Sequence, residues 1–312
     1  MKALVTGATG FVGRALCARL TASSAEVVPA VRSKYGLPHE VVVGNLNAST
    51  NWRPGLTGCD AVIHLAARVH VMDEAAQDPL PLYRDTNTEA TLNLARQAAD
   101  AGVKRFVFIS SIKVNGEFTE VGRPFTSEDL PAPEDPYGVS KHEAEQLLRQ
   151  IATETGMDVV IIRPPLVYGP GVKANFAAMM RWLGCGVPLP LAAVTDNRRS
   201  LVALDNLVDF IVTCLYHPAA ANQTFLVSDG EDLSTAQLLK RMGAAMGQPA
   251  RLFYVPLALL KLGATVLNKP EIYQRLCGSL RLDITKTRDV LGWTPPVTVE
   301  EGLRRAAAGF RP

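Results

Sequence analysis

The chain alternates short apolar runs with longer segments in which apolar residues recur at helical spacing. Most of the short runs are continuously apolar, as is typical of strands that are buried on both faces of a parallel sheet. The regular succession of strand, helix and strand predicts a doubly wound parallel α/β sheet. The predicted strands are 2–6, 26–31, 40–44, 60–66, 105–110, 158–164 and 224–228, and the predicted helices are 11–22, 86–101, 137–155 and 205–217.

After about residue 165 the pattern changes. The segments "RPPLVYGPG" and "CGVPLPLAAVTDNRRS" are rich in proline, glycine and small residues, which predicts loops that border a cleft. Two more helices are predicted, over 234–247 and 298–310. The chain should therefore form two units, which are a first domain over 1–168, rejoined by 203–229, and a smaller C-terminal α/β lobe made of 169–202 and 230–312.

The longest apolar stretch is "VPLALLKLGATVL", residues 255–267. A lysine, a proline and a glycine interrupt it, and it is too short to cross a bilayer, so no stable membrane span is expected. We expect a helix that packs over a pocket or over the core. A peripheral contact with a membrane surface is the alternative.

Charge and composition narrow the classes of partner. The net charge is +2 and the chain has no run of Lys and Arg, which argues against a nucleic-acid partner. The five cysteines are far apart and form no C-x-x-C, so we expect reduced thiols in a cytoplasmic protein. The histidines lack the spacing of metal ligands, which predicts no metal site. The N-terminus resembles a strand rather than a signal peptide.

The segment "VTGATGFVG" places Gly7, Gly10 and Gly13 between the first strand and the first helix. A turn at Gly7 needs freedom from Cβ strain, and close packing of helix on strand needs a glycine at 13. The helix start, with Phe11 and Val12, offers free N–H groups and a positive dipole end to phosphates. This context predicts a dinucleotide site in a Rossmann-type sheet, within the first domain.

The segment "YGVSK" places Tyr137 and Lys141 one helical turn apart. Oxidising an alcohol needs a base for the hydroxyl proton, and a nearby ammonium favours the phenolate of a tyrosine electrostatically. Ser111 ends the strand "RFVFISS", at the edge where open α/β sheets bind ligands, and could hydrogen-bond the reacting oxygen. These three residues are the predicted catalytic group.

The glycine spacing G-x-x-G-x-x-G, taken with "YGVSK", resembles the short-chain dehydrogenase/reductase superfamily. Nearly the whole chain is similar to its extended branch of NAD-dependent nucleotide-sugar epimerases, dehydratases and reductases. The segments that carry this likeness include "RPPLVYGPG", "RRSLVALDNLVDF" and "LGWTPPVTVEEGL". The likeness is greatest to UDP-N-acetylquinovosamine dehydrogenases, which are 4-keto reductases, and to UDP-hexose 4-epimerases.

The end of the second predicted strand bears on the choice of cofactor. It reads "AVRS", without the carboxylate that would bind the ribose 2′-hydroxyl of NAD. Arg32 and Ser33 could instead bind a 2′-phosphate, so NADP(H) is favoured and NAD(H) remains the alternative. The resemblance implies further cofactor contacts, although the family usually has Asp where this chain has Asn45. These implied contacts are Asn45, Leu46, Leu65, Ala66, Ala67, Pro164 and Val167, together with Asn87, which stands where the family places a structural asparagine.

The resemblance also implies a nucleotide-diphosphate sugar as substrate, with UDP favoured. Arg199, Arg281 and Asn175 are then the candidates for binding the diphosphate or ribose, because arginines form charge-assisted bonds to such groups. Family members often dimerise through helices equivalent to 86–101 and 137–155, so a homodimer is expected.

The residues after Ser111 limit the reaction. Dehydratases of the family place an acidic pair where this chain has Ile112 and Lys113, so dehydration is not expected. Lys113 either faces solvent or contacts the substrate. Val69, near a position that is often polar in epimerases, favours reduction. The leading hypothesis is a UDP-4-keto-6-deoxy-hexosamine reductase of polysaccharide biosynthesis, and a UDP-hexose 4-epimerase with retained NAD is the main alternative. A reductase of a hydrophobic carbonyl and a cofactor-sensing protein without activity remain open.

Overall fold

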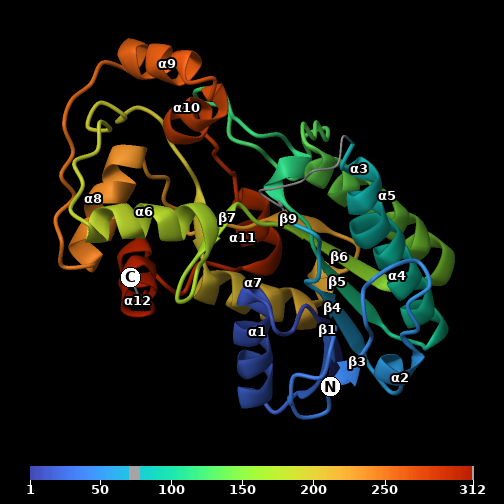
Figure 1. Cartoon of the computed structure of the whole chain (residues 1–312). Coiled ribbons are helices and arrows are strands. Elements are labelled where there is room, and N and C mark those ends of the chain that lie inside the picture. The colour runs from blue at the N-terminus through green and yellow to red at the C-terminus, as the bar shows by residue number, and fades with distance from the viewer. Residues whose placement is uncertain (70–77, 311–312) are drawn as a thin grey trace.

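The computed structural model describes residues 1–69 and 78–310 of the chain. Its centre is a seven-stranded sheet in the order β3-β2-β1-β4-β5-β6-β9, in which every neighbouring pair is parallel (Figure 1). The predicted doubly wound α/β class is confirmed. The strands are β1 Lys2–Thr6, β2 Glu26–Val31, β3 Val41–Val42, β4 Ala61–His64, β5 Arg105–Ile109, β6 Asp158–Arg163 and β9 Thr224–Leu226.

Several strands end earlier than their apolar runs predicted. The strand predicted over 60–66 stops at His64, because the backbone N–H groups of Leu65 and Ala66 turn to the side-chain oxygen of Thr6, at 3.2 and 3.1 Å. β1 lies between β2 and β4, so the strand order reverses there. Chains leaving β1 and β4 diverge at such a point and leave a crevice at their carboxyl ends.

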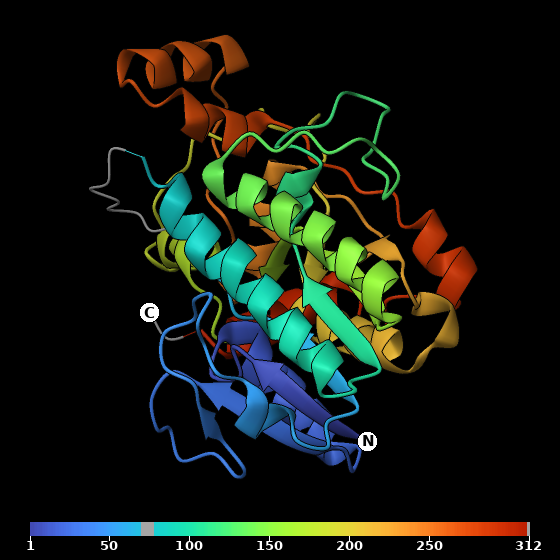
Figure 2. The ribbon, with the colours of Figure 1, turned by 90° about the vertical axis from the view of Figure 1, so that its right-hand side faces the viewer.

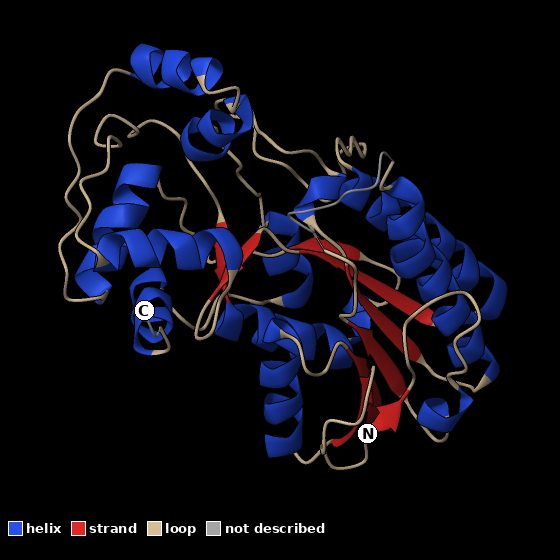
Figure 3. Cartoon of the chain, in the orientation of Figure 1, coloured by secondary structure: helices blue, strands red, loops and turns tan. Residues whose placement is uncertain are grey.

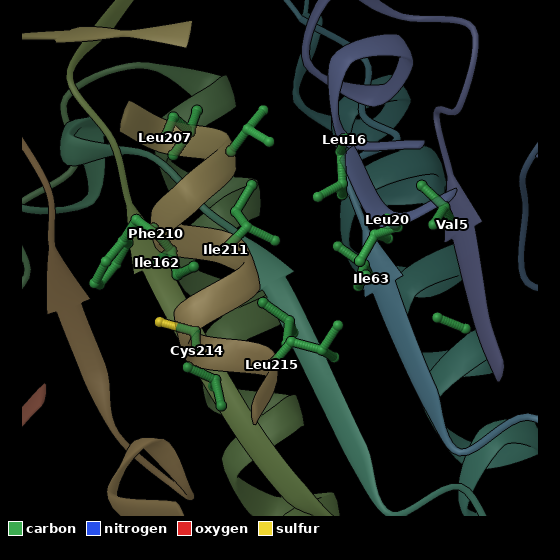
Figure 4. Packing of buried hydrophobic residues seen from close by; sticks show 14 of the residues in the cluster. Val5, Leu16, Leu20, Ile63, Ile162, Leu207, Phe210, Ile211, Cys214 and Leu215 are labelled. Carbon is green, nitrogen blue, oxygen red and sulfur yellow. The ribbon is translucent and has the colours of Figure 1, made fainter. Parts of the chain in front are cut away.

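Helices cover both faces of the sheet. On one face, α1 (Phe11–Ala22) packs against α7 (Leu204–Tyr216), and Figure 4 shows Leu16 and Leu20 of α1 facing the side of α7 that carries Ile211. On the other face, α4 (Ala90–Asp100) and α5 (Pro136–Thr155) lie side by side (Figure 2). Both interfaces bury continuous apolar surface, which is the main favourable term in folding.

The helix predicted over 86–101 is divided into pieces. It follows α3 (Leu80–Tyr83) through a π-helical turn, η1 (Arg84–Glu89), before α4 begins. Asn87 lies in this turn, fully buried, and its side chain bonds backbone atoms of Arg68 and the hydroxyl of Ser140. A π turn is frequent at functional sites. Here it carries the predicted structural asparagine.

A second cluster of elements packs beside the main sheet (Figure 3). Its two-stranded parallel sheet pairs β7 with β8, and its helices enclose a separate apolar core. Buried Asp229 connects the parts, because it accepts hydrogen bonds from Tyr168 and Asn206 at 2.7 Å each. The elements are β7 Leu166–Tyr168, α6 Ala174–Gly184, β8 Leu201–Ala203, α8 Thr235–Ala245 and α12 Val299–Ala308. α11 Thr285–Leu291 packs against β9 of the main sheet instead. The short helices elsewhere are α2 Arg53–Leu56, η2 Ile112–Val114 and η3 Pro218–Ala220.

The helix predicted within 255–267 forms as α9 (Leu257–Val266), and α10 (Pro270–Cys277) follows it. Leu260 of α9 packs against the apolar core of the second cluster, as expected of a helix over the core, but most of α9 is exposed. Apolar composition predicted the helix but could not say what covers it. Within residues 1–69 and 78–310, the helices all fall short of the length and apolarity that crossing a bilayer demands.

Candidate active site

The glycine turn lies at the crevice above β1. Gly7 has φ +66°, and a Cβ there would lie 2.9 Å from the backbone nitrogen of Ala66. A Cβ on Gly13 would lie 2.1 Å from the carbonyl oxygen of Gly7, so α1 packs too closely on the turn for any larger residue. Gly10 is the N-cap of α1, and Phe11 and Val12 form its first turn. Unpaired N–H groups at such a helix start attract a small anion such as a pyrophosphate.

A buried hydrogen-bond chain supports the neighbouring turn after β4. Thr91 donates to the carbonyl of Asn87 at 2.7 Å and lies 2.9 Å from Nε2 of His64, so Nε2 carries the proton. Nδ1 of His64 then accepts from Thr6, 2.7 Å away. Burial, together with the charge of Lys141, lowers the pKa of His64 to about 3, which keeps the ring neutral. This chain fixes Leu65 and Ala66 beside the glycine turn.

Asn87 holds the same turn from the other side. Its Oδ1 accepts from the N–H of Arg68 at 2.8 Å, and its Nδ2 donates to the Arg68 carbonyl and to Ser140, at 3.0 Å each. Ser140 in turn donates to the carbonyl of Tyr137 at 2.8 Å. The predicted structural asparagine therefore connects the turn after β4 with the helix that carries the predicted catalytic couple.

Lys141 is buried beneath the crevice. Its Nζ donates to the carbonyl of Ile109 at 2.8 Å and lies 4.3 Å from the centroid of the Phe108 ring. Burial lowers the pKa of Lys141 to about 7, although Glu145 opposes the shift. A carbonyl and an aromatic face stabilise an ammonium less than a carboxylate would, so the charge on this lysine is finely balanced at neutral pH.

Tyr137 sits in the first turn of α5, half-buried, next to Ser111. The helix begins at Pro136, capped by Asp135, whose Oδ1 accepts from the N–H of Gly138 at 2.6 Å. Burial and the Asp135 charge raise the pKa of Tyr137, whereas a hydrogen bond with the Ser111 side chain lowers it. The structure thus brings together all three predicted catalytic residues.

Lys113 lies close to this group. Its Nζ is 2.5 Å from Asp135 and 2.8 Å from Glu117, and its backbone N–H donates to the Ser111 hydroxyl. The ammonium therefore holds two carboxylates rather than facing open solvent. Although positions 112 and 113 carry no carboxylate, Glu117 and Asp135 lie nearby. Because Lys113 neutralises both, neither is free to serve as the acid of a dehydration.

Comparison with known proteins assigns the family. The model of the "NAD dependent epimerase/dehydratase family" matches residues 3–228. The chain belongs to this family. A UDP-glucose 4-epimerase from Vibrio cholerae is 52% identical, over 98% of this chain and 94% of the relative. As a member of this family, the protein is an NAD(P)-dependent enzyme of the extended short-chain dehydrogenase type.

Two solved structures agree with this epimerase/dehydratase fold. MoeE5 in complex with UDP-glucuronic acid and NAD is 26% identical, with a TM-score of 0.78, 99% of this chain covered and 98% of the other. RMD from Pseudomonas aeruginosa complexed with NADPH is 25% identical, with a TM-score of 0.76 and 99% of each chain covered. The family thus includes structures with either cofactor.

The glycine turn between β1 and α1 fits the binding of an NAD(P) molecule. Gly7, Gly10 and Gly13 leave room that a Cβ would fill, at the N-terminus of α1. Arg32 and Ser33 follow β2 directly and are exposed, as an adenosine-ribose contact would require. The remaining predicted contacts follow the carboxyl ends of β3, β4 and β6 or lie in β7, and they are Asn45, Leu46, Leu65, Ala66, Ala67, Pro164 and Val167.

The three predicted substrate residues are arranged less tightly. Arg199 and Arg281 lie on adjacent backbone segments, because Arg199 forms a parallel bridge with Leu280. Arg199 is half-buried and donates to the carbonyl of Gly278 at 3.2 Å, whereas Nε of Arg281 bonds Asp232 at 2.9 Å. Burial lowers the pKa of Arg199, and the negative charge of Glu117 opposes this shift. Glu117 is the same carboxylate that Lys113 binds. Asn175 is exposed in the first turn of α6.

Several residues of the site escaped the sequence analysis. Asp135 before Pro136 is an N-cap followed by proline at the first helical position, a signal that was readable. His64 and Thr91 carried no such signal, since a histidine within an apolar strand does not reveal its partners. The described residues hold no group of three or more His, Cys, Asp or Glu side chains suited to a metal, and His70 lies outside them.

Proposed function

We propose that this protein is a nucleotide-sugar oxidoreductase acting at C4, and that its net reaction is the 4-epimerisation of a UDP-hexose. The observation that carries the epimerase assignment is the full-length identity of 52% to a UDP-glucose 4-epimerase. The intact group of Tyr137, Lys141 and Ser111 supports oxidation and reduction at a carbinol carbon. The sequence-based preference for a reductase therefore becomes the second candidate.

In this proposal Tyr137 takes the proton of the C4 hydroxyl and returns a proton to the C4 oxygen afterwards. Ser111 donates to the same oxygen and holds it beside the phenol. Protonated Lys141 favours the phenolate and is placed to bond a ribose hydroxyl from below the crevice. Bound NAD(P) supplies the acceptor and donor of hydride. Epimerisation additionally requires the 4-keto sugar to present its other face before hydride returns.

The diphosphate of the substrate is assigned to Arg199, with Arg281 and Asn175 as further contacts. Arg199 is the better placed of the two arginines, because its partner is a backbone carbonyl, whereas Arg281 is engaged by a carboxylate. A diphosphate offers Arg199 charge-assisted bonds that a carbonyl does not. UDP is the favoured nucleotide because both the 52% relative and the MoeE5 structure carry UDP-sugars in their names.

The test is to incubate catalytic amounts of protein with UDP-glucose and to follow UDP-galactose by NMR. We expect epimerisation without net change at the absorbance band of reduced nicotinamide. Stoichiometric consumption of NADPH with a UDP-4-keto-6-deoxy-hexosamine, and no epimer from UDP-glucose, would establish the reductase instead. If neither substrate turned over while cofactor bound, assignment to C4 chemistry would be wrong.

The reductase is kept as a second candidate because of two observations. First, no carboxylate stands at positions 31–33, and exposed Arg32 could bind a 2′-phosphate there. Second, Val69 is an exposed apolar residue near a position that is often polar in epimerases. We expect Arg32→Ala to raise the KM for NADPH about tenfold and to leave the KM for NADH unchanged. Steady-state kinetics with both cofactors measures this. An equal effect on both would make Arg32 an ordinary loop residue and remove this support for NADP(H).

We further propose the domain division predicted from the sequence, with cofactor bound by 1–168 and 203–229 and substrate held by 169–202 and 230–312. Two largely separate apolar cores support it, although Leu291 and Trp293, from the second range, pack in the core of the main sheet. A homodimer through α4 and α5 and a cytoplasmic location are proposed from family resemblance. Sedimentation equilibrium tests the dimer, and fractionation of cells tests the location.

A further inference from the structure

The two helices α9 and α10 leave an unusual amount of apolar surface uncovered. Both views show them projecting at one end of the molecule, as its outermost elements there (Figures 1 and 2). Only Leu260 of α9 packs on the core of the second cluster. The exposed apolar side chains of the segment, with their exposed fractions, are Phe253 48%, Tyr254 72%, Leu257 37%, Leu259 57%, Leu262 59%, Val266 75%, Leu267 71% and Ile272 47%.

The outward face of α9 is mostly apolar, with exposed Thr265 at its edge. Half-buried Leu260 and Ala264, four residues apart, mark the inward face. At 100° per residue, Leu259, Leu262 and Val266 then fall on the opposite side. A surface helix of a globular protein normally turns charged residues outward. This helix turns leucine and valine outward, and its single charge, Lys261, lies at the flank.

The charges around this face are nearly all positive. Residues 251–278 contain four basic side chains and one acidic one, although the chain as a whole is almost neutral. The acidic one, Glu271, is paired with Arg275 at 3.6 Å. Arg251, Lys261 and Lys269 are exposed and form no ion pair with any described residue. An apolar face bordered by free cations and by exposed Phe and Tyr matches helices that lie in the headgroup region of a membrane.

We propose that α9 and α10 dock this protein on the surface of a bilayer that contains anionic lipid. α9 has ten residues and is too short to cross the bilayer, so it would lie in the plane of the interface with Leu262 and Val266 inserted. The anionic headgroups complement the three free cations. A second copy fits less well, because a two-fold contact would bring equal positive charges together. The proposal does not depend on the proposed activity.

The experiment is flotation of the full-length protein with vesicles of phosphatidylcholine, with and without phosphatidylglycerol. We expect binding to the vesicles that contain phosphatidylglycerol, weakened by salt. The double substitution Leu262→Glu with Val266→Glu should reduce the partition coefficient at least about tenfold, since two apolar side chains lose their burial. Lys261→Gln with Lys269→Gln should reduce it several-fold.

The matched control is Val121→Glu, which charges an apolar side chain that is 98% exposed elsewhere on the surface. Its binding should equal that of the unaltered protein. Circular dichroism and cofactor binding confirm that each variant is folded. No binding by the folded protein, or equal loss with Val121→Glu, would overturn the proposal. So would sedimentation showing that the Leu262 and Val266 variant turns a dimer into a monomer, because a second copy would then cover this face.

Discussion

The cofactor end and the substrate end of this site are built in different ways. At the cofactor end, buried hydrogen bonds of Thr6, His64 and Asn87 fix the turn after β4. Thr6 and His64 also hydrogen-bond each other. At the substrate end, Arg281 is tied to Asp232 and Asn175 stands exposed. The cofactor end is therefore held by buried hydrogen bonds, whereas the candidate substrate residues are only partly buried or exposed. In the proposed function, the buried end carries the chemistry and the more exposed end carries the choice of sugar.

If the chemistry resides entirely at the buried end, Tyr137→Phe should have the largest effect of all. Removing the phenolic hydroxyl removes the acid and base, and turnover should fall about a thousandfold or more. Cofactor binding should persist, because the ring itself remains. Epimerisation rate and cofactor affinity measure the two parts. The control is Tyr216→Phe, a change at a half-exposed ring on α7 that should leave both unchanged. Full turnover by Tyr137→Phe would remove the tyrosine from the mechanism.

The close packing of the glycine turn predicts a large effect of Gly13→Ala. The added Cβ would lie 2.1 Å from the carbonyl oxygen of Gly7. Because that oxygen belongs to the backbone, no side chain can rotate away and the turn itself must move. Cofactor affinity should fall about a hundredfold, because the phosphates lose their alignment with the N–H groups of α1. Gly263→Ala in α9, where a Cβ meets open space, is the control and should leave affinity unchanged. Similar binding by both variants would show that the turn adapts.

The substrate end offers its own comparison between two arginines. Arg199→Ala should weaken UDP binding about tenfold or more, because one charge-assisted contact to the diphosphate is lost. Arg281→Ala should weaken it only a few-fold, because Asp232 already engages that side chain. Calorimetric titration with UDP gives both values, and exposed Arg304→Ala serves as the reference. The reverse order would reassign the diphosphate to Arg281.

The buried lysine makes a smaller prediction about stability. Burial lowers the pKa of Lys141 from 10.5 to about 7, so between these values the unfolded chain binds more protons than the folded protein. The free energy of unfolding should therefore rise with pH across this window, by up to about 1.4 kcal/mol per pH unit from this group. Urea denaturation of the cofactor-free protein measures it. Lys141→Met should lose this part of the slope, and exposed Lys240→Met should keep it. Identical slopes for all three would contradict a buried, displaced Lys141.

The two ends also differ in how far the sequence predicted them. The glycine turn and "YGVSK" are local patterns whose spacing carries their geometry, so their residues were identified without any tertiary contact. The same applies to the helix over 11–22, whose bounds the structure reproduces. At the substrate end, Arg199 and Arg281 meet only because segments about eighty residues apart pair. No local sequence pattern predicts such pairing, or the ion pair between Asp232 and Arg281.

The errors have the same origin. The apolar run at 60–66 extends beyond β4, because the N–H groups of Leu65 and Ala66 bond the side chain of Thr6. The run at 40–44 likewise extends beyond β3, which comprises only Val41–Val42. The π turn at Asn87 follows from bonds to Arg68 and Ser140 across the fold. Apolar composition alone did not decide between a covered and an exposed helix over 255–267, since an apolar helix usually finds a partner within its own domain.

In the proposed mechanism, hydride leaves C4 of a bound sugar and returns to it, while Tyr137 takes and returns the proton of the C4 hydroxyl. The most direct measurement uses UDP-glucose carrying deuterium at C4, with the product C4 position examined by NMR and mass. We expect UDP-galactose that retains the deuterium at C4, because hydride passes to the cofactor and back without meeting water. Product in which solvent hydrogen has replaced the deuterium, or no C4 product from the cofactor-loaded protein, would contradict it.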